Sequence, residues 1–230
     1  MNDIKFNLSE SLQRLDTISS SRIYVPDNEM VFPPLNELPS ASLTKVFATV
    51  VCIRCDIENS ASTELRAQYH RAIISEFSCI LGQESQSRDI FVRDNLIFAV
   101  FETPLKSHIK SVINATARIN ALKSVINAKL GGGKKYLTTL VSVSFDNLEM
   151  QLIPCPRQDV KVQNIVWTGK AINNVVNMSN NFKDTTGVLI ESVVYNNLDD
   201  EDRAFFESEG TYYKSNFVNT LINNWVKNNV

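Results

Sequence analysis

The stretch that decides the fold is Val46-Phe-Ala-Thr-Val-Val-Cys-Ile-Arg-Cys-Asp-Ile-Glu-Asn-Ser-Ala61. Its first part, Val46–Cys55, is almost continuously apolar and rich in β-branched residues, which predicts a strand buried on both faces. Asp56 follows where this apolar run ends. A single carboxylate at a strand end is commonly a turn former or a helix cap, so Asp56 alone does not define a functional site.

A second acidic residue has the same context. Asp89–Arg93 and Leu96–Phe101 are apolar runs that flank Asp94-Asn95, a pair of residues that suits the turn of a hairpin. We therefore expect Asp94 at the hairpin tip or one residue short of it. Two carboxylates side by side at strand ends form an oxygen-rich pocket that suits Mg²⁺ or Mn²⁺, the metals that organise phosphate chemistry.

The remaining pattern alternates helices with strands. Ser60 or Ser62 is expected to cap a helix that runs to about Leu81, with Gly82 as its stop. The later elements are predicted as a helix over Leu105–Leu130, a hairpin of Leu137–Phe145 and Glu149–Pro154 around Asp146-Asn147, a strand at Val162–Val166, a helix from Trp167 to about Asn180, a strand at Gly187–Ile190, and a terminal helix within Gly210–Val230.

Two local motifs invite a chemical interpretation that their context rejects. The string Gly131-Gly-Gly-Lys-Lys follows a helix and leads into a strand, the reverse of a phosphate-binding loop, so we interpret it as a helix stop and flexible connection. Cys52 and Cys55 have the C-x-x-C spacing but lie within the first strand, where residues three apart point to opposite faces. We interpret them as core cysteines and expect neither a zinc nor a redox site.

Composition narrows the class of protein. The chain has 230 residues, 43% hydrophobic and 21% charged, with a formal net charge of −2. These values are typical of a soluble globular protein, and the dispersed Lys and Arg residues predict no nucleic-acid binding. No apolar stretch approaches the roughly 20 residues that span a membrane, and no signal peptide is evident. We expect a cytoplasmic protein.

The first 42 residues differ from the rest. Leu8, Leu12 and Leu15 form one stripe of a short amphipathic helix, and four prolines then mark an extended segment. We predict an N-terminal leader over residues 1–42 and one catalytic domain over residues 43–230.

The predicted order of elements contains the βαββαβ core of the ferredoxin-like class, an α+β fold. Within this core three motifs resemble the class III nucleotide cyclases over roughly residues 44–198. Asp56-Ile-Glu-Asn-Ser-Ala is similar to their Asp-Ile-x-Gly-Phe-Thr motif, and Arg93-Asp94 with its apolar return strand is similar to their Gly-Asp hairpin. Gly169-Lys-Ala-Ile-Asn173 is similar to their Gly-x-x-Val-Asn helix entry.

The resemblance implies two-metal chemistry, in which the ribose 3′-oxygen of a nucleoside triphosphate attacks the α-phosphorus and pyrophosphate leaves. It assigns two Mn²⁺ or Mg²⁺ ions to the carboxylates of Asp56 and Asp94 and to the backbone carbonyl of Ile57. It also places the amides of Asn59, Ser60 and Ala61 against the phosphates, at the start of a helix.

The resemblance further implies a head-to-tail homodimer, in which Asn173 of one chain orients the ribose bound to the other. Four residues later the family has an arginine that stabilises the transition state, and this chain has Asn177. Lys214 or Lys170 is the candidate replacement for that charge. Arg93, in place of the usual glycine beside Asp94, is a second departure.

The residues that would read the base also depart from the family. Adenylate cyclases carry a lysine and an aspartate where this chain has Arg88 and Val166, and Val166 cannot accept a hydrogen bond from adenine. Trp167 and Phe47 are bulky residues expected near the same pocket, which favours a smaller base. The sequences Trp167-Thr-Gly-Lys-Ala-Ile-Asn173 and Val188-Leu-Ile-Glu-Ser-Val-Val-Tyr195 resemble the pyrimidine cyclases of bacterial Pycsar antiphage systems, whose cyclic UMP or cyclic CMP activates a separate effector protein.

Three functions remain open at this point. We expect UTP, or else CTP, as the substrate. The first alternative is a degenerate cyclase-like module that binds a nucleotide or a partner without turnover. The second is an adenylate or guanylate cyclase.

Overall fold

The computed structural model describes Asp16, residues 43–154 and residues 163–229. The predicted leader helix with Leu8, Leu12 and Leu15, and the proline-rich segment after it, lie outside the described residues. Contacts divide the chain into two units. The larger contains residues 46–148 and 168–229, and the smaller includes residues 43–45, 149–154 and 163–167.

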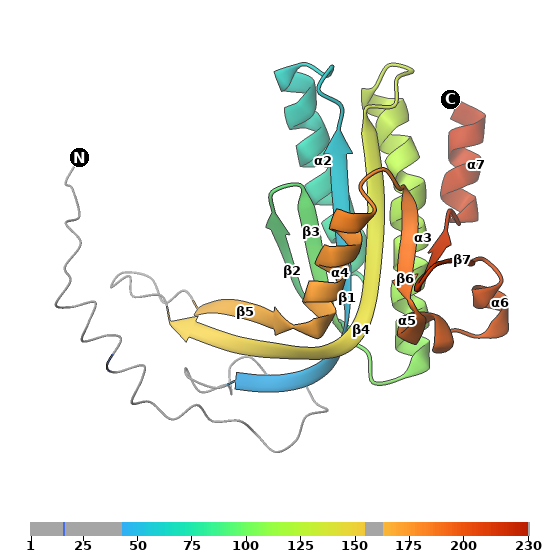
Figure 1. The fold of residues 1–230 in the computed structure, drawn as a ribbon. Coiled ribbons are helices and arrows are strands. Elements are labelled where there is room, and N and C mark those ends of the chain that lie inside the picture. The colour runs from blue at the N-terminus through green and yellow to red at the C-terminus, as the bar shows by residue number, and fades with distance from the viewer. Residues whose placement is uncertain (1–15, 17–42, 155–162, 230) are drawn as a thin grey trace, which may run out of the picture. The chain divides into compact units, whose positions relative to one another are not determined.

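The described elements from residue 43 onward begin with a βαββαβ core (Figure 1). Its elements are β1 (Leu43–Ile57), α2 (Thr63–Gly82), β2 (Ser87–Arg93), β3 (Leu96–Glu102), α3 (Lys106–Leu130) and β4 (Leu137–Pro154). The strands lie in the order β2-β3-β1-β4, and β3 is antiparallel to both of its neighbours. β1 and β2 therefore run parallel with β3 between them, which is the split βαβ arrangement of the ferredoxin-like class.

Further elements extend this core after β4. They are β5 (Gln163–Gly169), α4 (Lys170–Asn181), β6 (Gly187–Glu191), α5 (Ser192–Asn196), α6 (Asp200–Arg203), β7 (Glu207–Glu209), β8 (Tyr212–Ser215) and α7 (Thr220–Asn229). β6 adds to the sheet parallel to β4, and β8 and then β7 continue it. β5 pairs with β4.

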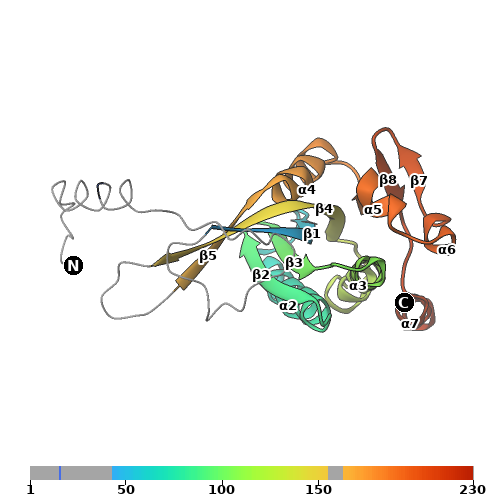
Figure 2. The same ribbon diagram turned by 90° about the horizontal axis from the view of Figure 1, so that it is seen from below.

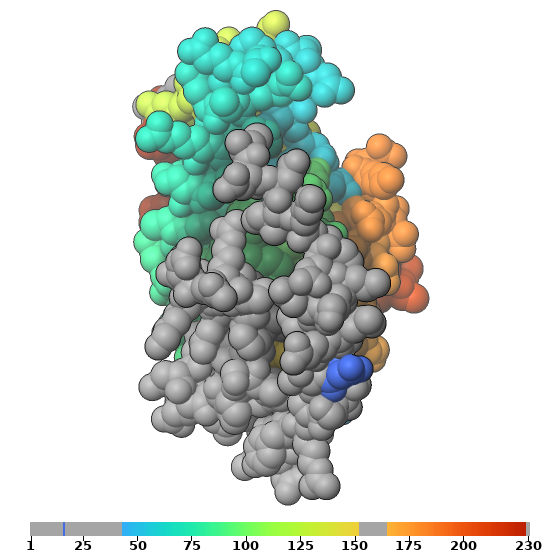
Figure 3. Space-filling view, turned by 90° about the vertical axis from the view of Figure 1, so that its left-hand side faces the viewer, coloured from blue at the N-terminus to red at the C-terminus, as the bar shows by residue number. Residues whose placement is uncertain are grey.

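The two faces of the sheet bury different partners. Ile53 and Cys55 belong to the main apolar core, which also contains Tyr69 and Phe77 of α2 and Val112 of α3. The alternate residues of β1 point to the opposite face, where α4 lies (Figure 2). Figure 3 shows part of the outer surface of α2. In the described part of the chain, no helix is long and apolar enough to span a membrane.

The two cysteines of β1 are free and buried, as predicted. Cys55 packs in the core on the α2 and α3 side, whereas the Cys52 thiol lies 3.5 Å from the Ser179 hydroxyl of α4. Burial raises the pKa of the Cys52 thiol to about 11, and it raises that of Cys55 further. Both thiols therefore stay protonated at neutral pH, which fits a packing role.

The string of three glycines ends α3, as predicted. A Cβ on Gly131 would lie 2.1 Å from the carbonyl oxygen of Lys134 and 2.5 Å from that of Asn127. Gly132 and Gly133 have φ angles of +56° and +90°, values that side chains other than glycine's rarely adopt. The turn into β4 thus depends on glycine at this place.

The predicted hairpin around Asp146-Asn147 is wrong, because β4 runs through these residues as one strand from Leu137 to Pro154. Leu148 and Met150 are both buried and Asn147 is exposed, so the period-two alternation of a strand continues across the polar pair. Burial of apolar side chains therefore outweighs the turn preference of the Asp-Asn pair.

Two helix starts are also more sharply defined than the sequence allowed. Ser62, and not Ser60, caps α2, because its hydroxyl accepts a hydrogen bond of 3.2 Å from the Leu65 amide. The fourth helix begins at Lys170 and not at Trp167, since β5 continues to Gly169, which has a φ of +124°.

Candidate active site

The strand ends that carry Asp56 and Asp94 lie next to each other. The amide of Cys55 donates a 2.9 Å hydrogen bond to the Asn95 carbonyl, and the Asn95 side-chain amide donates one of 2.8 Å to Asp56 Oδ1. Asp94 occupies the hairpin tip with a φ of +55°, which a two-residue turn requires. Its carboxylate is exposed and has no hydrogen-bond or ionic partner among the described residues. The structure thus brings the two acidic residues together at one end of the strands of the sheet.

The potential metal ligands at this end of the sheet are oxygen atoms. Two carboxylates and the carbonyl of Ile57, the last residue of β1, form a hard donor set of the kind that Mg²⁺ and Mn²⁺ prefer. The described residues contain no group of three or more His, Cys, Asp or Glu side chains placed to hold a metal. A metal here would therefore take its other ligands from water and from a phosphate, which is the usual arrangement for Mg²⁺.

Arg54 is part of this site, although the sequence analysis did not identify it as a site residue. Its side chain is about 9% exposed, and its Nε donates a 2.7 Å hydrogen bond to Asp56 Oδ2. The two terminal nitrogens donate to backbone carbonyls around the end of α4, those of Ser179, Phe182 and Lys183. One guanidinium therefore joins the Asp56 carboxylate to the last turn of α4.

The turn after β1 leads directly into α2. The amide of Ala61 donates a 3.1 Å hydrogen bond to the Glu58 carbonyl, so this expected phosphate donor is already engaged. The amides of Asn59 and Ser60 have no partner among the described residues and remain free to donate. The Ser60 hydroxyl donates to Glu58 Oε2 at 3.1 Å.

The predicted asparagine stripe is present on α4. Asn173, Asn177 and Asn180 are exposed, whereas Val175 and Met178 are buried against the sheet. The neighbouring Asn174 lies 3.5 Å from the Ser144 hydroxyl of β4. The three exposed asparagines therefore point away from their own sheet.

Asn173 lies beside the middle of β4, away from the end of the sheet that carries Asp56. The start of β4 is next to the end that carries Asp56 and Asp94, because the Glu58 amide donates to the Tyr136 carbonyl. Ser144, beside Asn174, is about 23 Å along the strand from Leu137 at about 3.3 Å per residue. The Asn173 and Asp56 of one chain thus belong to different local sites.

The two candidate lysines differ in their surroundings. Lys170 pairs with Asp146 at 2.7 Å, and this hydrogen bond raises the pKa of its ammonium group. Lys214 on β8 lies opposite Leu189 of β6 and Glu207 of β7 in the sheet and forms no ion pair among the described residues. Because Leu189 packs with Met178 of α4, Lys214 is on the α4 side of the sheet.

The candidate base residues belong to several different elements. Arg88 on β2 forms an ion pair with Glu102, and Phe47 stacks on Phe145 with ring centroids 6.2 Å apart. Phe47 lies about 30 Å along β1 from Asp56. Val166 and Trp167 belong to the smaller unit, where Trp167 is buried.

Several known proteins with similar sequence or structure are nucleotide cyclases. No protein-family model matches the chain. A uridylate cyclase from Treponema porcinum is 25% identical over 243 residues, covering 96% of this chain and 84% of that protein. The crystal structure of a guanylyl cyclase matches with a TM-score of 0.60 at 10% identity, over 76% of this chain and 94% of that one. An adenylyl cyclase from P. aeruginosa matches with a TM-score of 0.55 at 11% identity, over 75% and 95%.

These likenesses confirm the predicted α+β fold. At such low sequence identities, the similarity to solved structures shows the fold alone. That fold is the one of class III cyclase catalytic domains.

Proposed function

The chain has the fold of the class III nucleotidyl cyclases and resembles a uridylate cyclase along almost its whole length, and on that premise we propose that it is a pyrimidine nucleotide cyclase. It converts UTP, or else CTP, to the 3′,5′-cyclic monophosphate and pyrophosphate. The product acts as a second messenger on a separate effector protein in antiphage defence.

The observation that carries this proposal is the separation of two half-sites on one sheet. Asp56 and Asp94 lie at one end, whereas Asn173 lies beside the middle of β4, about 20 Å away along the sheet. A head-to-tail homodimer brings the Asp56 and Asp94 end of one chain against α4 of its partner. Each dimer then contains two complete sites, and the exposed asparagine stripe of α4 faces the other chain.

The described residues have distinct tasks in such a site. Asp56, Asp94 and the Ile57 carbonyl would hold two Mg²⁺ or Mn²⁺ ions, which when bound lower the pKa of the ribose hydroxyl and offset phosphate charge. The free amides of Asn59 and Ser60 are placed to donate to phosphate oxygens. From the partner, Asn173 orients the ribose and Asn177 extends the same polar stripe.

Lys214 is the better candidate for the missing transition-state charge. Lys170 is already neutralised by Asp146, and its charge is therefore largely spent. Lys214 has no such partner in the described structure and lies on the same side of the sheet as α4. A cation on this side would offset the charge that builds on the phosphates as the bond to pyrophosphate breaks.

The pyrimidine preference rests on the uridylate cyclase relative and on the absence of an adenine acceptor at Val166. Arg88 is held by Glu102, so its guanidinium is oriented and partly neutralised. Phe47 is 37% exposed, which leaves an aromatic face free beside Phe145.

The product assay tests the function directly. Purified protein with Mn²⁺ and an equimolar mixture of ATP, GTP, CTP and UTP is expected to yield cyclic UMP as the main product, measured by mass spectrometry. Cyclic CMP as the main product would keep the pyrimidine assignment and change the substrate. Cyclic AMP or cyclic GMP as the main product would contradict the proposal and favour the purine cyclase.

The same protein tests the shared site by complementation. Asp94→Asn and Asn173→Ala are each expected to be nearly inactive, whereas a mixture of the two forms heterodimers with one intact site. With random pairing, activity should recover to about a quarter of wild type, because half the dimers carry one working site of two. A mixture that exchanges subunits, shown by differently tagged chains, and still lacks activity would contradict the composite site.

The alternative of a binding module without turnover is favoured by one observation, the neutral Asn177 in place of a cation. It predicts that the protein binds one triphosphate with Mn²⁺ in calorimetry and releases neither cyclic nucleotide nor pyrophosphate from any of the four.

A further inference from the structure

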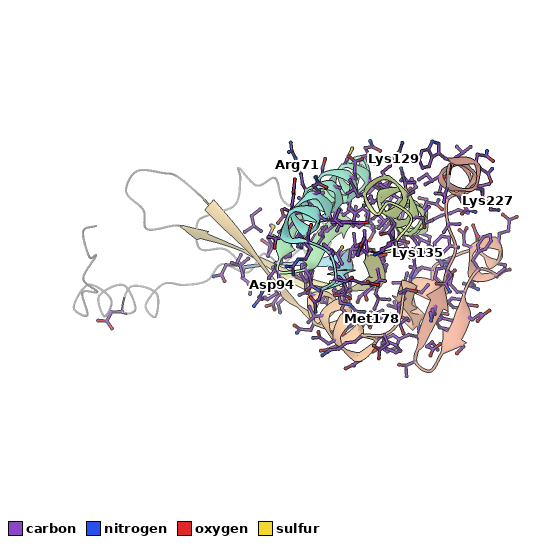
Figure 4. All side chains as sticks on the ribbon, turned by 90° about the horizontal axis from the view of Figure 1, so that it is seen from above. Arg71, Asp94, Lys129, Lys135, Met178 and Lys227 are labelled. Carbon is purple, nitrogen blue, oxygen red and sulfur yellow. The ribbon has the colours of Figure 1, made fainter. Side chains whose placement is uncertain are left out.

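A cavity of about 500 Å³ lies apart from the residues of the candidate active site. It is formed where the C-terminal part of α3 and the glycine turn meet the start of β4, the loop before β6, and α7. The lining residues are Lys123, Ser124, Asn127, Ala128, Gly133, Lys134, Lys135, Leu137, Thr138, Thr186 and Val226. Figure 4 labels Lys135 beside α3 and Asp94 at a separate place on the side of α2.

The charged side chains among the described lining residues are all lysines. They are Lys123, Lys134 and Lys135, and no carboxylate is among these residues. None of the three ammonium groups has an acidic partner in the part of the chain that the structure describes. Lys123 donates a 3.0 Å hydrogen bond to Asn120 Oδ1, and Lys134 lies 6.0 Å from the centre of the Tyr136 ring.

The charges of Lys123 and Lys135 repel one another. The pKa of Lys123 is lowered, first by burial of its ammonium group and then by the charge of Lys135. An anion bound between them removes this repulsion and favours the protonated form of Lys123. The cavity thus gains the most from a ligand that carries negative charge.

The backbone that presents the lysines is held in place. Asn127 Nδ2 donates to the Leu137 carbonyl at 2.9 Å, and Asn127 Oδ1 accepts from the Leu137 amide at 2.9 Å. The Tyr69 hydroxyl donates to the same Oδ1 at 3.1 Å. Together with the glycine turn, these bonds fix the positions from which Lys134 and Lys135 extend.

The rest of the lining limits the class of ligand. Hydroxyl groups of Ser124, Thr138 and Thr186 can donate to phosphate oxygens, and Leu137 and Val226 add an apolar wall. The volume lies within the range of small-molecule sites. We propose that this cavity is a second, non-catalytic site that binds a phosphate-bearing small molecule.

This site would communicate with the metal end through the backbone. The Glu58 amide donates to the Tyr136 carbonyl, so the residue after Lys134 and Lys135 is bonded to the turn that leads from Asp56 into α2. Because the glycine string follows α3 and leads into β4, it is not a phosphate-binding loop of the strand-to-helix kind. Its two lysines serve a phosphate site formed with α3 and α7.

Binding is tested on the full chain in EDTA at constant ionic strength, so that no metal occupies the carboxylates. The probes are inorganic phosphate, uridine monophosphate and glucose 6-phosphate, each measured by calorimetry. We expect saturable binding tighter than about 1 mM for at least one probe. Equal affinities would assign recognition to the phosphate group alone, and tighter binding of one organic phosphate would show that the apolar wall takes part.

Three variants locate the binding. Lys123→Gln and Lys135→Gln are each expected to raise the Kd for the bound probe tenfold or more, because each substitution removes a charge-assisted hydrogen bond. The matched control is Lys227→Gln, an exposed lysine next to Val226 that does not line the cavity, with unchanged Kd. Lys135 is exposed, so its substitution tests the site without disturbing the core. No binding by any probe, or wild-type affinity in both lining variants, would overturn the proposal.

Discussion

Asp94→Asn is expected to lower the turnover number for cyclic nucleotide formation by about 10³-fold or more, since several kcal/mol of charge stabilisation depend on the bound metals. Asp94 is the cleaner of the two acids to change, because its exposed carboxylate has no partner in the described structure. Its substitution should therefore leave the melting temperature unchanged. Product formation is followed by mass spectrometry and stability by calorimetry.

The matched control is Glu201→Gln, an exposed carboxylate on α6, which should retain wild-type turnover and stability. Asp56→Asn is expected to abolish activity as well, but it also removes the counter-charge of buried Arg54 and should lower stability. Near-normal turnover of Asp94→Asn with Mn²⁺ present would contradict the assignment of Asp94 to the metals.

Arg54→Leu is expected to lower the free energy of unfolding by about 3 kcal/mol, because it leaves the Asp56 charge and several carbonyls of the α4 end without their donor. For a chain of this size the melting temperature should fall by about 6–12 °C. Arg54→Lys keeps the charge but cannot reach all of these acceptors. Its free energy of unfolding should therefore lie between those of the wild type and Arg54→Leu.

Urea unfolding measures this effect, and Arg71→Leu is the control. Arg71 is exposed on α2 and has no partner in the described structure, so its loss should change the unfolding free energy by less than about 0.5 kcal/mol. Equal midpoints for Arg54→Leu and Arg71→Leu would show that the observed contacts of Arg54 contribute nothing to stability.

The sequence predicted those parts of the fold and site that local patterns encode. The apolar run of β1 and the Asp94-Asn95 turn each have their own signature, and pairing of β1 with β3 then brings Asp56 and Asp94 together. The stripe of α4 follows from helical spacing alone. These predictions required no knowledge of which distant segments meet.

Arg54 had no such signature. Its partners are backbone carbonyls far along the chain, around Ser179 and Phe182. Because every residue has a backbone carbonyl, the sequence does not distinguish these acceptors from any others. In the run Val46–Cys55 it is one charged residue within a buried strand, which signals a partner without identifying it. The lysine cavity was missed for the same reason, since Lys123 and Val226 meet Lys135 only in the folded chain.

The hairpin error has a different cause. Asp146-Asn147 has good turn chemistry, but the decision depends on whether Leu148 and Met150 find a place to be buried. Local preference is worth little against the burial of two large apolar side chains. Only the tertiary structure shows whether the turn preference or the burial of these side chains determines the conformation.

In the proposed dimer, the contacts of Arg54 would couple the two sites. A cation on the Asp56 carboxylate would compete with Arg54 for the same oxygens, and Arg54 also holds the last turn of α4. The first turn of that helix carries Asn173, which the proposal assigns to the opposite site. Occupancy of one site would thus change the ribose-binding residue of the other, and by thermodynamic reciprocity the second site would change the metal affinity of the first.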